Sequence, residues 1–374
     1  MLKFFDFFAR KKAEQSTVLS NLNPEMQSPL FAHSLDKKKI HHAYDFEQWY
    51  KKLEPYTFTS RIIAIDKETA IAFTHYYREV MIGHANTLTR QDRLIIAEME
   101  NTLASILEED FHGKEVFIRM SNRSPKDGIA IRDLNTAGFQ AYQDIVQKNT
   151  SLNEQLIGLT DLQMKNLNCR TTQEIFNLIL TSERVYTDLL EAIRCSASEE
   201  DQWSTAIILR EWEAELRQEH EFRLFVYQNK VTAISQYNTY CHYPSYNDTE
   251  LQKKIVKRLK NFAEELSPLI KLDNYILDLA LIGDRVIVIE LNPFHPSTGA
   301  CLFSWQTDES ILKNRETDSM PILRVNDSPP QDQARWIELI LNQQEEYLNN
   351  ISNYPAYQSN INQSTAQNKA YRSR

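Results

Sequence analysis

The sequence predicts an α+β fold in which helices are combined with antiparallel strands, and three observations support this. Apolar side chains alternate over residues 204–240, where a turn at residues 228–230 separates two apolar segments. A second apolar pair within 274–292 turns at Gly283 and Asp284. Between residues 133 and 195, apolar residues recur every three or four positions, as in helices. Short turns join neighbouring strands in antiparallel order, so the sheets should be antiparallel.

The same patterns place the individual elements. Asp248 should cap the helix that follows it, because its side chain can accept backbone N–H groups, and Pro268 should lie beyond that helix's end. In chain order we expect a short helix at 46–53, a strand at 58–65, a helix at 92–110, a strand at 115–120, the helical stretch 133–195, strands at 205–211, 221–228 and 230–237, a helix of about twenty residues from Asp248, the strand pair in 274–292 and a helix around 332–349.

These elements suggest four regions. Residues 1–44 form a flexible leader without periodicity, and residues 351–374 form a Gln-, Asn- and Ser-rich disordered tail. An N-terminal subdomain covers 45–203, with a helical insert over about 129–200, and a C-terminal subdomain covers 204–350. The Phe-rich start of the leader suits contact with a membrane surface or a partner, and equally a frayed end that packs on the domain.

Composition excludes several classes of protein. The 51 acidic residues outnumber the 42 Lys and Arg and give a formal charge of −9, which argues against general nucleic-acid binding. No apolar run approaches the roughly 20 residues of a transmembrane helix, so we expect no such segment. We expect a cytoplasmic monomer whose four separated cysteines are reduced, buried thiols.

Glycine is unusually scarce, with 7 residues in 374 against the roughly 7% of average proteins. Every glycine is isolated, so neither a dinucleotide-binding fingerprint nor a P-loop can be written. If the protein holds phosphates, side-chain cations must do much of that work.

The second strand pair carries three oxygen-bearing side chains among apolar residues. If its turn has three residues, Ile282 pairs with Val286 and Asp278 lies opposite Glu290, with Asn292 two positions further along the same face. Two such carboxylates repel each other unless a positive charge lies between them.

Magnesium binds oxygen ligands of this kind, so Asp278, Glu290 and Asn292 form a predicted magnesium site. The alternative is a two-residue turn. That turn would slip the register by one and place Asp278 and Glu290 on opposite faces, each with its own Arg or Lys partner.

Cations follow the strand at 115–120. Arg119, Arg123 and Lys126 lie within eight residues and can clamp a polyphosphate. The alternative is a solvated turn whose cations pair with local acids.

Two strands add candidates for a nucleotide. Arg210, Glu211 and Trp212 end an apolar strand, which suits an adenine slot, although Trp212 suits the core equally. Glu221 and Arg223 share one face of the next strand, where they can contact ribose hydroxyls and a γ-phosphate, or support the sheet as an ion pair.

Taken in order, these segments resemble the cell division cycle protein 123 family, a branch of the ATP-grasp enzymes, over roughly residues 45–310. The matching motifs are Phe117-Ile-Arg-Met-Ser-Asn-Arg-Ser-Pro-Lys-Asp127, Leu209-Arg-Glu-Trp212, Glu221-Phe-Arg-Leu-Phe-Val226, Ile234-Ser-Gln236, Ile289-Glu-Leu-Asn-Pro-Phe294 and Leu302-Phe-Ser-Trp305.

The resemblance implies an ATP-grasp fold, in which two α/β subdomains with antiparallel sheets clamp Mg-ATP. It implies ATP and Mg²⁺ as cofactors, and a role as an assembly factor that binds the γ subunit of translation initiation factor 2. The residues that it assigns to metal are Asp278, Glu290 and Asn292, and those that it places at the nucleotide are Arg119, Ser121, Lys126, Asp127, Arg210, Glu211, Trp212, Glu221 and Arg223.

The sequence departs from the family pattern at several positions. Glu290 replaces the usual Asp, His295 a Gly, Gly299 an acidic residue, and Tyr237-Asn238 an Arg-Asp pair. These departures affect the expectation of nucleotide binding less than they affect the expected partner. The Asn- and Gln-rich tail also leaves room for a bacterial protein that acts in the cytoplasm of a eukaryotic host.

Two other functions use the same residues. An ATP-dependent ligase or kinase-like transferase would use Asp278, Glu290, Asn292 and Arg223 to stabilise the charge of phosphoryl transfer. A pseudoenzyme scaffold would only bind. The sequence shows no unmistakable nucleophile or general base, so it does not rank turnover against binding.

Overall fold

The computed structural model describes residues 42–130, 136–148, 150–195, 203–314 and 320–350. Nearly all of the predicted leader and all of the predicted tail lie outside these ranges. The chain divides into two compact units. The first unit comprises Met1–Thr57 and Leu216–Trp336, and the second comprises Phe58–Glu215 and Ile337–Arg374.

The first unit contains a five-stranded sheet in the order β8-β7-β5-β6-β9. Its strands are β5 (Glu221–Tyr227), β6 (Lys230–Gln236), β7 (Tyr275–Ile282), β8 (Arg285–Pro293) and β9 (Ile322–Arg324). All neighbours are antiparallel except β6 and β9. Its helices are α3 (Phe46–Leu53), α10 (Thr249–Ile270) and α11 (Glu309–Leu312), with 3-10 turns at Glu54–Tyr56, Gln218–His220 and Pro244–Asn247.

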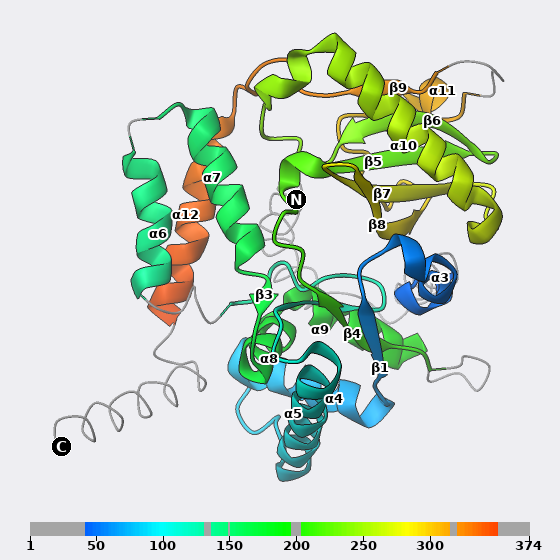
Figure 1. Ribbon diagram of the computed structural model, residues 1–374. Coiled ribbons are helices and arrows are strands. Elements are labelled where there is room, and N and C mark those ends of the chain that lie inside the picture. The colour runs from blue at the N-terminus through cyan, green and yellow to red at the C-terminus, as the bar shows by residue number, and fades with distance from the viewer. Residues whose placement is uncertain (1–41, 131–135, 149, 196–202, 315–319, 351–374) are drawn as a thin grey trace, which may run out of the picture. The chain divides into compact units, whose positions relative to one another are not determined.

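The two faces of this sheet are covered differently. Helix α10 lies along one face (Figure 1). On the other face, Phe225 and Ile276 form an apolar cluster with Phe303 and Leu312, which come from the segment that follows β8. The face that carries Ile276 is also the face of Asp278, because strand side chains alternate.

The second unit contains a four-stranded antiparallel sheet in the order β1-β4-β2-β3. Its strands are β1 (Ser60–Ala64), β2 (Val116–Met120), β3 (Asn168–Cys169) and β4 (Ala206–Glu211). Its helices are α4 (Lys67–Val80), α5 (Arg90–Phe111), α6 (Thr136–Gln147), α7 (Leu152–Lys165), α8 (Thr172–Thr181), α9 (Glu183–Cys195) and most of α12 (Gln333–Asn350).

One apolar core joins this sheet to its helices. Ile118 and Leu209 are fully buried on one sheet face and pack with residues of α4, α5, α8 and α9, such as Phe73, Leu103 and Ile179. A core of this size holds the sheet rigidly, because close-packed interiors leave few voids. The opposite sheet face is therefore available for polar side chains.

The predicted fold class is confirmed: the protein is α+β, with two sheets in which antiparallel pairs predominate. The predicted strands and the helix start at Asp248 are also confirmed, and the Asp248 side chain accepts from the N–H groups of Glu250 and Leu251. Pro268 is a correction. It lies inside α10, in the last turn before the left-handed cap at Lys271, where it removes one hydrogen bond near the end of the helix.

Other elements were not assigned from the sequence. These are α4, β3, α11 and β9. The start of α4 does carry a signal, because the Asp66 side chain accepts from the N–H of Thr69 at 2.7 Å. Strands β3 and β9 are too short to show alternation.

The division into units differs from the predicted subdomains. Strand β4, expected to open the C-terminal subdomain, is the strand between β1 and β2 in the second unit. Helix α3, expected in the N-terminal subdomain, belongs to the first unit and packs against α10. Contacts between segments far apart in the chain decide to which unit β4 and α3 belong. The periodicity of the sequence carries no information on such contacts.

Two smaller observations concern composition. Within the described residues, no helix is long and apolar enough to cross a membrane. Cys169, Cys241 and Cys301 are free thiols, of which Cys169 and Cys241 are buried and Cys301 is partly buried.

Candidate functional site

The β7–β8 hairpin carries the three predicted metal ligands. Its turn has two residues, Gly283 and Asp284, because Ile282 pairs with Arg285. The predicted three-residue turn, with Ile282 opposite Val286, is therefore wrong. A two-residue turn alone would leave Glu290 opposite Leu277, on the sheet face that α10 covers.

A β-bulge brings Glu290 back to the position opposite Asp278. The register shifts by one between Asp278 and Leu279, so that Leu279 pairs with Val288 and Asp278 pairs with Glu290. Ile289 is the extra residue. The bulge therefore brings Glu290 to the face of Asp278, as predicted, although by another route.

Asn292 joins the pair on the same face. It pairs with Ile276 in the strand register, and its Nδ2 donates to Asp278 Oδ2 at 3.2 Å. With the carboxamide in this orientation, its oxygen remains an acceptor. The three side chains that were predicted to converge are thus neighbours on one face of the sheet.

Asp278 has a charged partner on the adjacent strand. Arg223 of β5 lies opposite it, and its Nε and Nη2 donate to Asp278 Oδ1 and Oδ2 at 2.8 and 2.7 Å. The side chains are only 8% and 2% exposed. Burial by itself lowers the pKa of Arg223, but the Asp278 carboxylate outweighs it and holds that pKa well above its ordinary value. An arginine therefore supplies the positive charge that a buried carboxylate needs.

The other contacts of Arg223 involve two positions where the sequence departs from the family pattern. Arg223 Nη1 donates to the carbonyl oxygen of Gly299 at 2.5 Å. Its guanidinium also lies over the ring of Tyr237, 5.1 Å from the centroid. A backbone carbonyl and an aromatic ring thus complete the surroundings of the guanidinium.

Two further residues of this unit lie close by in sequence. Glu221 is buried and stands two positions before Arg223 on the same strand face. Arg223 forms an ion pair with Asp278 of the neighbouring strand, whereas the sequence suggested Glu221 as its partner. Asn238 has a local role, since its side chain donates to Gln218 Oε1 and accepts from the N–H of Tyr240.

The donor set is compatible with magnesium. Within the described residues, no group of three or more His, Cys, Asp or Glu is placed to hold a metal ion. A cation here would have the carboxylates of Asp278 and Glu290 and the Asn292 oxygen. Magnesium is commonly bound by one or two carboxylates, with waters and substrate phosphates as its other ligands.

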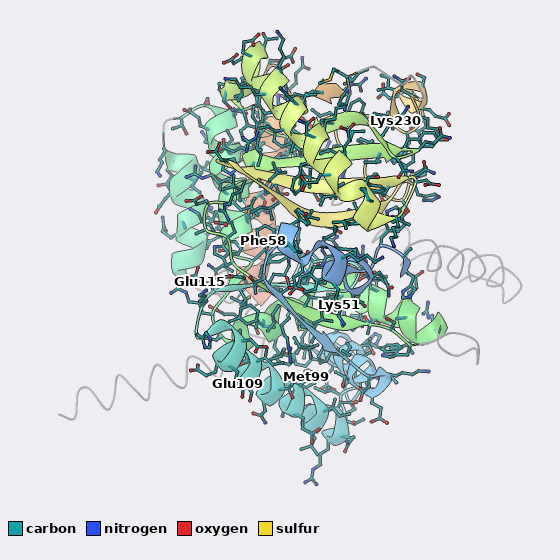
Figure 2. All side chains as sticks on the ribbon, turned by 45° about the vertical axis from the view of Figure 1, so that its right-hand side comes forward. Lys51, Phe58, Met99, Glu109, Glu115 and Lys230 are labelled. Atoms are coloured by element: carbon teal, nitrogen blue, oxygen red, sulfur yellow. The ribbon has the colours of Figure 1, made fainter. Side chains whose placement is uncertain are left out.

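In the second unit, two buried arginines share one sheet face. Arg119 and Arg210 alternate with Ile118 and Leu209 along β2 and β4, so they lie opposite the helix-covered core. Arg119 Nε donates to the Met120 carbonyl at 3.1 Å. The Arg210 guanidinium lies 4.7 Å from the ring centroid of Phe58, which is labelled in Figure 2. These arginines are held by their own sheet.

The residues that follow β2 have partners within the second unit. Arg123 forms a bidentate ion pair with Asp188 of α9, with its Nε 2.7 Å from Oδ2, so its partner is an acid far along the chain and not a local one. The hydroxyl of Ser121 accepts from the N–H of Ala206 at 2.8 Å.

Asp127 supports the start of α9. It accepts from the hydroxyl of Ser182 at 2.6 Å and from the N–H of Arg184 at 3.0 Å. Lys126 lies half-buried in the same turn, where its N–H donates to Ser124. These contacts give Asp127 a structural role whatever else the turn binds.

The end of β4 offers less than predicted. The N–H of Glu211 donates to Thr59 and that of Trp212 to Glu115, so these two donors are used within the sheet. The Glu211 carboxylate accepts from Lys114 at 2.6 Å. Trp212 is half-buried rather than a core residue. An adenine at this edge would have to use other groups than these N–H donors.

Sequence reasoning missed two partners of the β7–β8 site. Thr57 donates from its hydroxyl to the Val288 carbonyl at 2.6 Å, and Gly299 supplies a carbonyl to Arg223. No sequence signal identifies a backbone acceptor, and Thr57 precedes its partner by more than two hundred residues.

Comparisons with known proteins identify the family of this chain. The D123 family model matches residues 162–354, slightly more than half of the chain. The translation initiation factor eIF2 assembly protein of Schizosaccharomyces pombe is 23% identical over 312 residues, which cover 81% of this chain and 88% of that protein. Its counterpart from Candida albicans is 22% identical over 75% of this chain and 81% of its own length.

A solved structure shows the same fold. C-terminally truncated Cdc123 from Schizosaccharomyces pombe matches with a TM-score of 0.55 at 20% identity, over 78% of this chain and 98% of that one. Family model, relatives and fold all agree with the resemblance that the motifs predict. The chain belongs to the D123 family, that of cell division cycle protein 123.

Proposed function

We propose that this protein binds ATP and magnesium and acts as an assembly factor for translation initiation factor eIF2. Two relatives that align over most of their length carry the name of eIF2 assembly protein, which supports the partner. The ATP-grasp class and the γ subunit as the point of contact are finer parts of this proposal, and both rest on the family resemblance. The factor acts in the cytoplasm.

The observation that carries the proposal is the bulge in β8. It turns Glu290 and Asn292 to the face of Asp278, so that three oxygen-bearing side chains gather on one face of the sheet. Bulges are over-represented at sheet edges and next to active sites, where they re-aim a side chain. Magnesium bound by these three residues would neutralise phosphate charge on ATP.

The protein's own residues prepare this site. Arg223 keeps Asp278 ionised and fixes its plane through two parallel N–H···O bonds. In the second unit, Arg119 and Arg210 are the buried cations that we assign to the nucleotide, in place of a glycine-rich loop. Glu221, Ser121, Lys126, Asp127, Glu211 and Trp212 remain predicted nucleotide contacts.

Calorimetry tests the magnesium site. Glu290→Gln removes a negative ligand and should weaken Mg-ATP binding at least about tenfold, about 1.4 kcal/mol, because the metal loses charge compensation. ATP binding in EDTA should be unchanged. Asp284→Asn removes an exposed carboxylate from the turn of the same hairpin and should bind as wild type. Equal Mg-ATP affinity in Glu290→Gln and wild type would refute the site.

A further inference from the structure

The bulge in β8 is contacted by Thr57, which lies outside the sheet. Thr57 forms an isolated parallel bridge with Val288, and its hydroxyl donates to the Val288 carbonyl at 2.6 Å. Val288 is fully buried and immediately precedes the extra residue Ile289. The hydroxyl therefore holds the backbone at the point where the register changes.

The location of β8 makes this contact important. In the order of the five-stranded sheet it is an edge strand, paired with β7 on one side, and Thr57 forms its bridge to Val288 outside that sheet. Thr57 follows the 3-10 turn Glu54–Tyr56, which ends the α3 segment. That turn places Thr57 beside β8, where its hydroxyl donates to the Val288 carbonyl.

The orientation of the metal ligands depends on the register at this point. On the turn side of the bulge, Val288 pairs with Leu279, and beyond it Glu290 pairs with Asp278. A regular continuation would turn Glu290 toward the face that α10 covers. Whatever stabilises the bulge at Val288 therefore stabilises the placement of Glu290 and Asn292.

We propose that Thr57 is a positioning residue for the magnesium site, acting through the Val288 carbonyl on the orientation of Glu290 and Asn292. This inference rests on the proposed function. Thr57 contributes no ligand to the metal; it fixes the backbone that presents two of them. Outer partners of this kind often change metal affinity by about 10–100-fold when they are removed.

The test compares two substitutions by calorimetry, with ATP in Mg²⁺ and with ATP in EDTA. Thr57→Val keeps the shape of the side chain and removes the hydroxyl, so Mg-ATP affinity should fall about tenfold while affinity in EDTA stays constant. Thr57→Ser keeps the donor and should restore the Mg²⁺-dependent gain. The ratio of the two affinities is the readout, because loss of stability alone does not change it selectively.

Thr232→Val is the matched control. Thr232 also lies in the first unit and donates from a buried hydroxyl to a backbone carbonyl, that of Leu312, at 2.8 Å, but away from β8. Melting temperatures should fall in both valine variants. Only Thr57→Val should lose the Mg²⁺-dependent gain in affinity.

The outcomes separate this inference from the proposed function. If wild-type protein binds ATP equally with and without Mg²⁺, the proposed function fails. If wild type shows the gain and Thr57→Val retains it, the positioning role is overturned. An equal loss in Thr57→Val and Thr232→Val, or a loss that Thr57→Ser does not rescue, also overturns it.

Discussion

Asp278 and Arg223 form a buried ion pair whose two members depend on each other. Both lie at nearly complete burial, and both carboxylate oxygens accept from the guanidinium. The desolvation of two charges offsets most of their attraction, so the pair as a whole contributes modestly to stability. Removing one member is different, because the remaining charge is then buried without its counter-ion.

Arg223→Met should therefore destabilise the protein by about 3–5 kcal/mol in urea unfolding at neutral pH. Lys253→Met is the control, because Lys253 and its partner Glu250 are about 70% exposed and such pairs contribute about 0–1 kcal/mol. Excess Mg²⁺ should restore part of the stability of Arg223→Met only, since the cation can replace the lost charge. A loss below about 1 kcal/mol in Arg223→Met would contradict this account of the pair.

At the scale of elements, the N-terminus of α5 is held by a capping box in which Asp92 is buried and Thr89 is exposed. Asp92 Oδ2 accepts from the N–H and hydroxyl of Thr89 at 2.8 and 2.7 Å, and it lies 3.0 Å from His75 Nδ1. Burial by itself raises the pKa of Asp92, but the hydrogen bonds from Thr89 and His75 outweigh it and lower that pKa below its ordinary value of 3.8. The ionised form of Asp92 is thus stabilised more in the folded protein than in the unfolded chain.

This shift makes the cap sensitive to acid. Because the pKa of Asp92 is depressed in the folded protein, the stabilisation from its ionised carboxylate is fully present above pH 3.8. That stabilisation is lost as the pH falls through the pKa of Asp92 in the folded protein. Asp92→Asn should cost about 1–2 kcal/mol near neutral pH, and the gap in unfolding free energy should close in acid. Denaturant titrations of wild type and Asp92→Asn at about pH 7 to about pH 3 measure this difference in unfolding free energy.

Glu154→Gln provides the comparison for the cap. It alters the equivalent position of the exposed capping box of α7, where Glu154 accepts from the N–H of Ser151 at 2.9 Å. Solvent competes for those hydrogen bonds, so the substitution should change stability less than Asp92→Asn does. A gap for Asp92→Asn that widens in acid would contradict the assigned sign.

At the scale of the whole molecule, the proposal requires a complex with eIF2. The protein should retain eIF2, through its γ subunit, from a eukaryotic lysate in the presence of Mg-ATP. Glu290→Gln should retain less, because occupancy of the site falls, whereas Asp284→Asn should retain as much as wild type.

Quantitative immunoblotting of the retained subunits measures this dependence. Absence of eIF2 at micromolar protein, with ATP occupancy verified in the same sample, would reject the assembly role. The ligase or kinase-like alternative would then be the better account of a Mg-ATP site, and a mass-spectrometric search for a modified client would follow.

Much of this molecule could be predicted from local patterns. Alternation identified β4 to β6, and two apolar segments around the turn at Gly283 and Asp284 identified β7 and β8. Asp248 marked the start of α10, because capping is a local interaction. The convergence of Asp278 and Glu290 was predicted correctly although the turn length was not. The family motifs could also be recognised without any structure.

The sequence by itself thus determined the α+β class, most elements and the residues around which a site is built. Tertiary structure alone decided three things: that β4 pairs between β1 and β2, that Arg223 is the partner of Asp278, and that a bulge held by Thr57 orients Glu290. Each depends on contacts between segments far apart in the chain. These three features are stabilised by strand pairing, burial and charge compensation, and the local periodicity of the sequence does not predict such contacts.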